Sequence, residues 1–581
     1  SLSTSADGAF ASSLSKYKEE LLGIMAEVVL KPAFPQEEFD KVLQQTKSQL
    51  SLRDADPNAV VSTVADVMRY GGGHPYGEVV TKETVENITL EDTRDYYQNY
   101  FKPNISYLAI IGDVQPKEAK KLAEKYFGSW ERGDVERKFY ERPTPPEETV
   151  VDFINFDGAS QSNISITYPI NLKRGTEDAI AASVLNSVLG GGGLSSRLNK
   201  NIREDKGYTY GVYSTISPDP LIGYFSAGGS VRNEVTDSAV VAMLEEIGRL
   251  REELVPEEEL QSIKNYIFGS FARRLERPET VASFALNTAR YKLPEDYYRT
   301  YLEKVDAVTP QRLMEVAKKY ILPDQAHVVV AGNQGEVAES LQRVGEVRFF
   351  DKIGQPIEAS SAEIPEGMTA QDVIDSYIKA IGGKEKLEAV EDMSLEMSTT
   401  IQGMALTMEM KRKAPNKMMS VVKMGENVMN ETKFDGESGY VSQMGQKQPI
   451  EGEEAEGMRE QATMFKELSY GGKGYELELA GVEKVGKKDA YKVIVTDEEG
   501  NETTEFYSVL TGLKLKEVAS REGPQGNSVT ITNEFSDYQE VNGIMVPFER
   551  TTVGAMPMPM TMKVEKAEIN SGLSDDTFEV E

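Results

Sequence analysis

"FPQEEFDKVLQQTKSQLSLRDADP" (34–57) and "VPEEELQSIKNYIFGSFARRLERP" (255–278) are two versions of one segment. Two prolines and one glutamate recur 221 residues apart: Pro35 and Pro256, Glu38 and Glu259, Pro57 and Pro278. A second pair, "TLEDTRDYYQNYFKPNISYLAIIGD" (89–113) and "TPQRLMEVAKKYILPDQAHVVVAGN" (309–333), aligns at 220 residues. Because the register holds over roughly 80 residues, the pattern indicates two tandem copies of one domain.

Each copy has the pattern of a mixed α+β domain. A proline followed by acidic residues predicts a long helix at 35–50 and at 256–273. Further helices are expected at 59–69 and 280–291, and at 89–101 and 309–320, the last two after a threonine cap. An apolar strand should follow, "ISYLAIIG" (105–112) in copy one and "AHVVVAGN" (326–333) in copy two.

Copy two contains about 70 residues ahead of the matched region, and copy one has no counterpart for them. They include the strand pattern "VVDFINFDGASQSNISITYPI" (150–170) and a helix pattern at 177–189. Residue 1 aligns near Ile222, so we expect domain one (1–140) to lack its N-terminal half, whereas domain two (150–350) has both halves.

A different pattern begins at residue 369. "EASSAEIPEGM" (358–368) has linker composition. "TAQDVIDSYIKAIGG" (369–383) predicts one helix, with Thr369 and Asp372 as a capping box. From about 392 to 580 only alternating strands and turns are expected, so domain three (369–581) should be antiparallel β.

Methionine is concentrated in this third domain. The stretch "AMPMPMTM" places Met556, Met558, Met560 and Met562 on one strand face, with Pro557 and Pro559 on the other confining the strand to a sheet edge. Core packing explains these methionines; a soft apolar groove for a lipid or a partner is the alternative.

Composition excludes several classes of function. The hydrophobic fraction is 39% and the charged fraction 27%, which is typical of a globular protein. The net charge is −31, which argues against nucleic acid and anionic membrane surfaces as partners. The chain has no cysteine, hence no disulfide or thiolate site, and no run of about 18 apolar residues that could span a membrane.

The most distinctive segment is "GGGLSSRLNKNIREDKGYTYGVYS" (191–214), which follows Gly190. Spacing alone places Arg203 in the last turn of a helix at 195–206, where it offsets the helix dipole, and makes Tyr210 a core strand residue after Gly207. The alternative is that guanidinium and phenol enter a cavity and donate hydrogen bonds to peptide carbonyls. The glycines at 190–193 would then admit peptide backbone, and "QSNISITYP" (161–169) would be an edge strand pairing with it.

The tandem halves and "SSRLNKNIREDKGYTYGVYS" (195–214) resemble the M16 family of insulinase, pitrilysin and mitochondrial processing peptidase. "FPQEEF", "HPYGEVVTKETVENIT" and "KPNISYLAIIGDV" add to this likeness, which covers about residues 1–350. The resemblance implies two tandem LuxS/MPP-like α/β sandwich domains, with Arg203 and Tyr210 holding the substrate peptide. Domain three is similar, more weakly, to lipoprotein-carrier-like half-barrels with an opening helix, "AIGGKEKLEAV".

The resemblance also implies an HxxEH zinc motif in the first domain, which this chain does not contain. Catalytic zinc needs about three His, Glu, Asp or Cys ligands, yet the only histidines are His74 and His327, and His74 is expected to pack in its loop. The family's supporting Glu falls on Val42 and its zinc-ligand Glu on Gln49, two helical turns apart on one face. We therefore expect no catalytic residue, metal site or cofactor in this chain.

Three functions remain open. The first is a non-catalytic M16-type subunit that binds a peptide substrate in a chamber shared with an active, zinc-bearing M16 partner, as a hetero-oligomer or, alternatively, a homodimer. The second is a competent zinc endopeptidase whose HxxEH lies upstream of Ser1. The third is a lipid- or lipoprotein-binding protein, with an apolar ligand in domain three. The carrier-like domain suggests a bacterial periplasmic, or otherwise exported, location.

Overall fold

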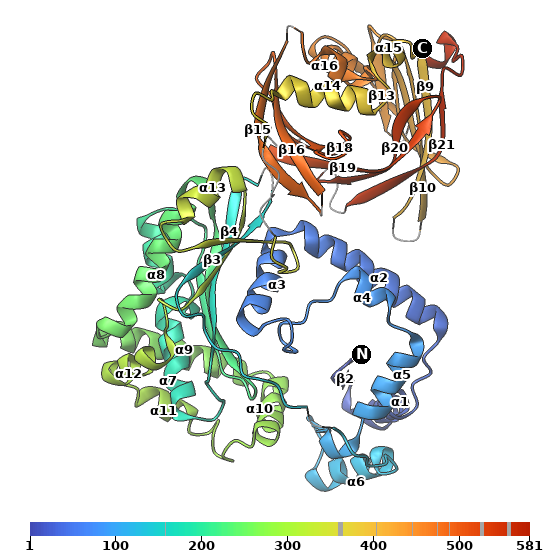
Figure 1. Cartoon of the computed structure of the whole chain (residues 1–581). Helices are drawn as coiled ribbons and strands as arrows, with labels where there is room; N and C mark the ends of the chain where they lie inside the picture. Colours follow the sequence, from blue (N-terminus) through green and yellow to red (C-terminus); the bar gives the residue numbers. More distant parts are fainter. Residues whose placement is uncertain are drawn as a thin grey trace. The chain divides into compact units, whose positions relative to one another are not determined.

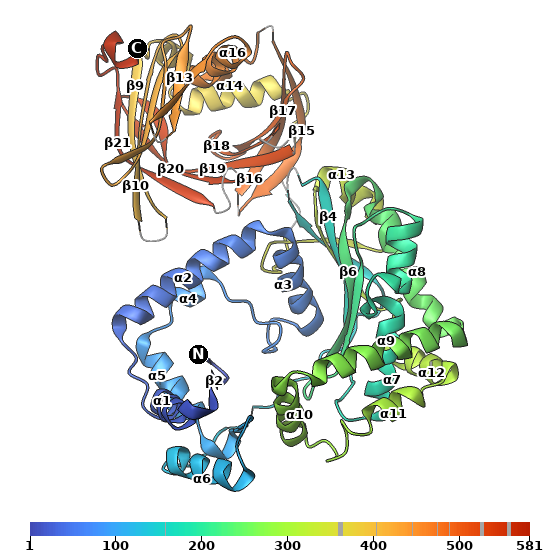
Figure 2. The same ribbon diagram turned by 180° about the vertical axis from the view of Figure 1, so that it is seen from behind.

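The protein is described by a computed structural model that divides into two compact units, residues 1–156 with 160–356, and residues from 357 onward (Figures 1 and 2). Both predicted M16-like segments therefore lie in the first unit. The structure describes residues 1–136, 138–156, 159–357, 364–401, 404–443, 445–472, 474–486, 488–522, 528–554 and 559–580. In these ranges no helix is long and apolar enough to cross a membrane.

A six-stranded mixed sheet organises copy two, in the order β5-β6-β4-β7-β3-β8. Strands β7 and β3 pair in parallel, and every residue of "HVVVAG" is buried, as expected for a strand covered on both faces. The strands are β3 (Val150–Asn155), β4 (Gln161–Ile170), β5 (Tyr213–Ser217), β6 (Gly223–Arg232), β7 (His327–Gly332) and β8 (Val347–Phe350).

One face of this sheet carries helices of copy two. The main core joins the sheet to α7 (Glu177–Asn186), α8 (Thr236–Glu252) and α12 (Pro310–Tyr320). Residues of α9 (Glu257–Leu275) complete that core, and α10 (Pro278–Tyr291) and α11 (Tyr301–Asp306) follow in the chain.

The other face is covered by a helix from copy one. Val60, Val61 and Val64 of α3 (Pro57–Tyr70) pack against strands β3, β7 and β8. The two copies are thus joined through a shared core, which Figures 1 and 2 show as α3 lying against the sheet.

The remainder of copy one is mainly helical. The predicted helices form as α2 (Gln36–Ala55), α3 and α5 (Leu90–Tyr100). The strand predicted at 105–112 is wrong: after a 3-10 turn at Pro103–Ile105 no strand is assigned there. Strand formation needs a neighbouring strand, and the described part of copy one offers this segment none. Other elements are β1 (Leu2–Ser5), β2 (Gly8–Ala11), α1 (Lys18–Leu30), α4 (Lys82–Glu86) and α6 (Pro116–Phe127).

The second unit is one antiparallel sheet of 13 strands, which confirms the predicted antiparallel β pattern. Its order is β14-β13-β12-β11-β10-β9-β21-β20-β19-β18-β17-β16-β15, so each pair of adjacent strands is consecutive in sequence except β9 and β21. The strands are β9 (Asp392–Ile401), β10 (Met404–Lys413), β11 (Lys417–Met424), β12 (Asn427–Phe434), β13 (Gly439–Gln443), β14 (Gln446–Ile450), β15 (Tyr475–Val485), β16 (Lys488–Asp497), β17 (Glu502–Ser508), β18 (Lys514–Glu522), β19 (Ser528–Val541), β20 (Ile544–Val553) and β21 (Met560–Ile569).

Helices pack on the sheet of this unit. The opening helix is α14 (Ala370–Ala380), with the predicted capping box at Thr369 and Asp372, and α15 (Lys384–Glu388) follows it. The expectation of strands alone after 392 is wrong, because α16 (Glu453–Ala462) forms between β14 and β15. Its buried Ala455 and Ala462 pack with Met418 and Phe434, contacts between sequence-distant residues that period-2 patterning does not show.

Methionines contribute to the core beside α14 and α15. Met562 is buried and Met560 packs against the same cluster, so core packing accounts for both. Met556 and Met558 lie outside the described residues.

Candidate peptide-binding site

The glycine-rich segment begins where α7 widens into a π-helical turn, η3 (Ser187–Gly191). A side chain at Gly190 would come within 2.5 Å of the Ser214 backbone nitrogen, so this glycine lets the helix approach β5. Gly191 and Gly192 likewise lie against atoms of their own domain, and only Gly193, with φ of 78°, has open space around it. Packing within the domain therefore explains glycine at the first three positions, and the approach of a peptide over 190–193 stays a prediction.

The basic helix that follows runs from η4 (Gly193–Ser195), a 3-10 turn, into η5 (Asn199–Asp205), which has π-helical geometry. Asn199 is fully buried and holds this helix to the next segment. Its Nδ2 donates to the carbonyl oxygens of Val212 (2.8 Å) and Gly193 (3.2 Å), and its Oδ1 accepts from the Val212 N–H (3.1 Å). Sequence spacing gave no role to Asn199; a polar residue at a core-facing helix position was the available signal.

Arg203 lies in the last turn of η5, as predicted. Its side chain is 37% exposed, with the Glu204 carboxylate 3.8 Å away as an ion-pair partner. Gly207, with φ of 65°, ends the helix, and the Tyr208 N–H returns to the Ile202 carbonyl at 3.0 Å. The arginine is therefore placed to complement the helix dipole and also to reach outward.

Tyr210 is 92% exposed and precedes β5, which begins at Tyr213. The interpretation of Tyr210 as a core strand residue is therefore wrong. A phenol held this far into solvent gains nothing from local packing. The described contacts include no hydrogen bond between Tyr210 and Arg203, although both side chains come from the same short segment.

The free sheet edge next to this segment is β5. In the described sheet β5 pairs with β6 alone, and its Tyr213 and Thr215 are exposed. The expectation that 161–169 is an edge strand is wrong, because β4 lies between β6 and β7. The polar side chains of β4 find partners inside the fold; Asn163, for example, accepts from the Ser230 hydroxyl at 2.5 Å.

The two histidines have separate structural roles and do not form a metal site together. His74 is buried, stacks on Tyr70 and meets Tyr76 edge-on, which agrees with a loop-packing role, and burial lowers its pKa. His327 lies in β7, where its Nδ1 is 2.7 Å from Asp152. The described residues contain no group of three His, Cys, Asp or Glu side chains that could hold a metal.

The positions that correspond to zinc-supporting acids lie on α2. Val42 and Gln49 are both exposed on this helix, and neither carries a carboxylate. An aliphatic side chain cannot bind zinc, and a neutral amide is a poor ligand. The residues present do not fit a catalytic zinc site.

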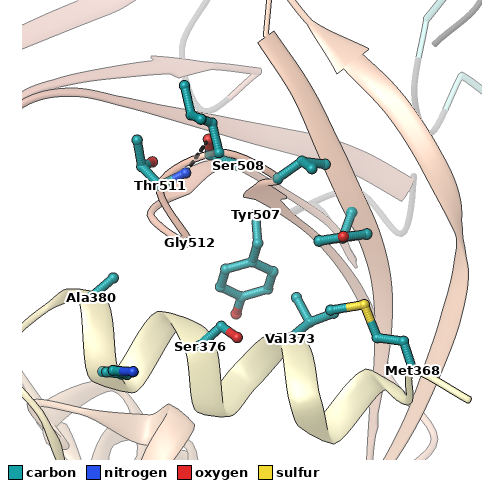
Figure 3. Close-up of a pocket in the computed structure, with 12 residues that line it drawn as sticks. Met368, Val373, Ser376, Ala380, Tyr507, Ser508, Thr511 and Gly512 are labelled. Carbon is teal, nitrogen blue, oxygen red and sulfur yellow. Dashed lines mark hydrogen bonds between the residues drawn. The ribbon is translucent and has the colours of Figure 1, made fainter. Parts of the chain in front are cut away.

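The second unit has a separate cavity of about 460 Å³ between α14 and the β17–β18 turn (Figure 3). Met368, Val373 and Ala380 line one side of it, and the ring of Tyr507 points toward the helix (Figure 3). Ser508 accepts a hydrogen bond from the Thr511 N–H at 3.1 Å, so this hydroxyl serves the turn.

A buried ionic cluster lies near the same strands. Lys514 donates to Glu505 at 2.8 Å and to Glu467 at 2.7 Å, which ties the segment before β15 to the sheet. Burial alone would raise the pKa of Glu505, but Lys514 and Lys466 outweigh it and lower the pKa to about 2. The carboxylates of this cluster are therefore ionised, and their ion pairs stabilise the fold; the cluster is not a titrating site.

The first unit is thus an α+β protein with helices on both faces of a mixed sheet and an exposed arginine–tyrosine segment at one sheet edge. Residues 87–267 match the family model described as Peptidase M16 inactive domain. That match covers the end of copy one and the first part of copy two, including Arg203 and Tyr210.

Known relatives agree with this match. The uncharacterized zinc protease YmxG of Bacillus subtilis is 24% identical over 333 residues, 55% of this chain and 77% of its own length. The non-peptidase homolog YmxG of Helicobacter pylori is 23% identical, with 53% and 70% covered. The solved peptidase M16 inactive domain from Pseudomonas fluorescens has a TM-score of 0.50 at 23% identity, covering 55% of this chain and 77% of that one, which supports the fold alone.

Proposed function

We propose that this chain is a non-catalytic M16-type subunit that binds an extended peptide through Arg203, Tyr210 and the edge of β5. The observation that carries the proposal is the 92% exposure of Tyr210 beside that edge. A free strand edge offers backbone hydrogen bonds to a peptide, whereas the guanidinium and the phenol donate to its carbonyls. Together they recognise backbone rather than one sequence.

Two helix positions that lack a zinc-binding carboxylate support the proposal that this chain is non-catalytic. Val42 and Gln49 replace the acids that the family places on this helix. The matched family model is itself described as an inactive domain, and one relative is called a non-peptidase homolog. We propose that zinc resides in an active M16 partner, in a hetero-oligomer or homodimer located in the periplasm or otherwise exported.

The zinc content of the purified chain tests the non-catalytic part. We expect less than stoichiometric zinc by elemental analysis and no chelator-sensitive peptide cleavage. Stoichiometric zinc with such cleavage would instead support the competent endopeptidase.

Peptide affinity tests the site. The probe is a net-neutral, unstructured, fluorescein-labelled peptide of Ala, Ser, Thr and Gln, with a version N-methylated at alternate backbone nitrogens. Arg203→Ala with Tyr210→Phe should weaken binding by about one to three orders of magnitude, since each hydrogen bond contributes roughly 0.5–3 kcal/mol. The melting temperature should stay unchanged because both side chains reach solvent. Unchanged affinity with a large drop in melting temperature would contradict the proposal that Arg203 and Tyr210 bind the peptide.

A second candidate function belongs to the second unit, where an apolar ligand could lie among methionines. The observation that favours it is Arg412, whose buried Nε has no hydrogen-bond partner in the described structure. Burial lowers the pKa of Arg412 to about 10, an effect to which Arg550 adds. Extraction and mass analysis of co-purified lipid tests this candidate; a lipid-free chain that also fails to take up a fluorescent fatty acid would exclude it.

A further inference from the structure

Between Gly207 and Val212 the chain runs beside β6 before the β5–β6 ladder begins. The first ladder pair is Tyr213 with Gly228. A side chain at Gly229 would come within 2.4 Å of the Gly211 carbonyl oxygen, so the loop lies tightly against β6. The loop that presents Tyr210 therefore follows the strand without the regular backbone hydrogen bonds of a strand pair.

The hydroxyl of Thr209 supplies the missing connection. Its Oγ1 donates to the Ser230 carbonyl of β6 at 2.6 Å and accepts from the Gly211 N–H at 3.1 Å. Arg232, at the end of β6, holds the start of the loop through a 3.0 Å bond from Nη1 to the Gly207 carbonyl. Backbone on both sides of Tyr210 is thus anchored while its side chain is exposed.

We propose that Thr209 is a positioning residue that fixes the Tyr210 loop for peptide binding. The inference rests on the proposed function, because it matters only if Tyr210 contacts the peptide. A loop already held in its binding conformation loses less conformational freedom when the ligand arrives, which raises affinity.

The test is Thr209→Val, which keeps the side-chain volume and removes the hydroxyl. With the same fluorescein-labelled peptide and the full chain, we expect affinity to fall about 3- to 30-fold. Thr209→Ser should restore affinity to within about twofold of wild type, since the hydroxyl returns. The matched control is Thr288→Val, which removes a hydroxyl bonded to the Phe284 carbonyl (2.8 Å) in α10 and should leave affinity unchanged.

A double-mutant cycle distinguishes positioning from general stabilisation. In a Tyr210→Ala background, Thr209→Val should have no further effect on affinity, because the two substitutions act through one contact. An equal loss in both backgrounds, or no loss in either, would overturn the role of Thr209. If Arg203→Ala with Tyr210→Phe leaves affinity intact, the proposed function itself fails; if that variant loses affinity and Thr209→Val does not, only this inference fails.

Discussion

Helices α3 and α10 occupy equivalent positions in the two copies, yet they pack differently. Both begin at a proline, 221 residues apart, and both end in an Arg-Tyr pair with the guanidinium over the ring, at 5.1 Å in α3 and 5.5 Å in α10. Six residues of α3 are buried, whereas α10 has none. Related sequence therefore yields related helices, but burial depends on what faces them.

The equivalent strand segments differ in the same way. β7 (His327–Gly332) is wholly buried between β4 and β3. In copy one the matching residues form no strand, and Tyr107, Leu108 and Ile111 are exposed. A strand is a property of a sheet, whereas a helix satisfies its backbone hydrogen bonds within itself. This explains why the helices of copy one form and its strand does not.

The largest expected difference is between Val60→Asp and Val281→Asp, at equivalent positions of the two helices. Val60 is fully buried and Val281 is 52% exposed. An unpaired carboxylate in the core should cost about 3 kcal/mol or more, but at an exposed site less than about 0.5 kcal/mol. Chemical denaturation of both variants measures this. Equal losses would mean that α10 is as buried as α3, and the comparison would fail.

Arg69→Met and Arg290→Met sharpen the comparison at the other end of the helices. Arg69 is buried, donates to Thr167 at 2.7 Å and lies over the ring of Tyr224. Its loss should cost about 2 kcal/mol, since a hydrogen bond from a charged group and a cation–π contact disappear. Arg290 is exposed, so its replacement should change the free energy of unfolding by less than about 0.5 kcal/mol. A similar loss in both variants would contradict this.

Much of this arrangement could be predicted from the sequence. The repeat, the helices and the end of the helix before Gly207 could be predicted because they depend on local sequence patterns. The central place of β4 could not be predicted, because it depends on which strands become neighbours. For Tyr210, spacing alone favoured the core, and the exposed position agrees with the alternative. The bond between the Ser230 hydroxyl and Asn163 shows how this central strand accommodates a polar side chain.

The contribution of α12 to the free energy of unfolding should depend on pH, because α12 pairs with a carboxylate of α7. Asp178 of α7 accepts from Lys319 (2.7 Å) and Tyr320 (2.7 Å) of α12 and also pairs with Arg312, which lowers its pKa to about 2. A carboxyl whose folded pKa is lowered stabilises the fold above its unfolded pKa, about 3.9, and loses this effect as pH falls toward 2.

Asp178→Asn should therefore cost about 1–2 kcal/mol at pH 7, after allowance for screening of the partly exposed cations, and almost nothing near pH 2. Glu177→Gln is the control, since it makes the same charge change at the neighbouring exposed position. Urea denaturation across this range gives the difference. A constant loss at all pH values would assign the effect to packing instead.

The smallest expected effect is that of Leu108→Lys in copy one. Leu108 is exposed and aligns with Val328, which is fully buried in β7. Replacing it should change the free energy of unfolding by less than about 0.5 kcal/mol, because it removes no packed contact.

The apolar neighbours of Leu108 in this unpaired segment nevertheless resemble an open strand edge, which promotes association between chains. Sedimentation velocity should then show less self-association in Leu108→Lys than in wild type, with unchanged unfolding. A large loss of stability would show that residues 105–111 are packed after all, and that the two copies are more alike than their burial indicates.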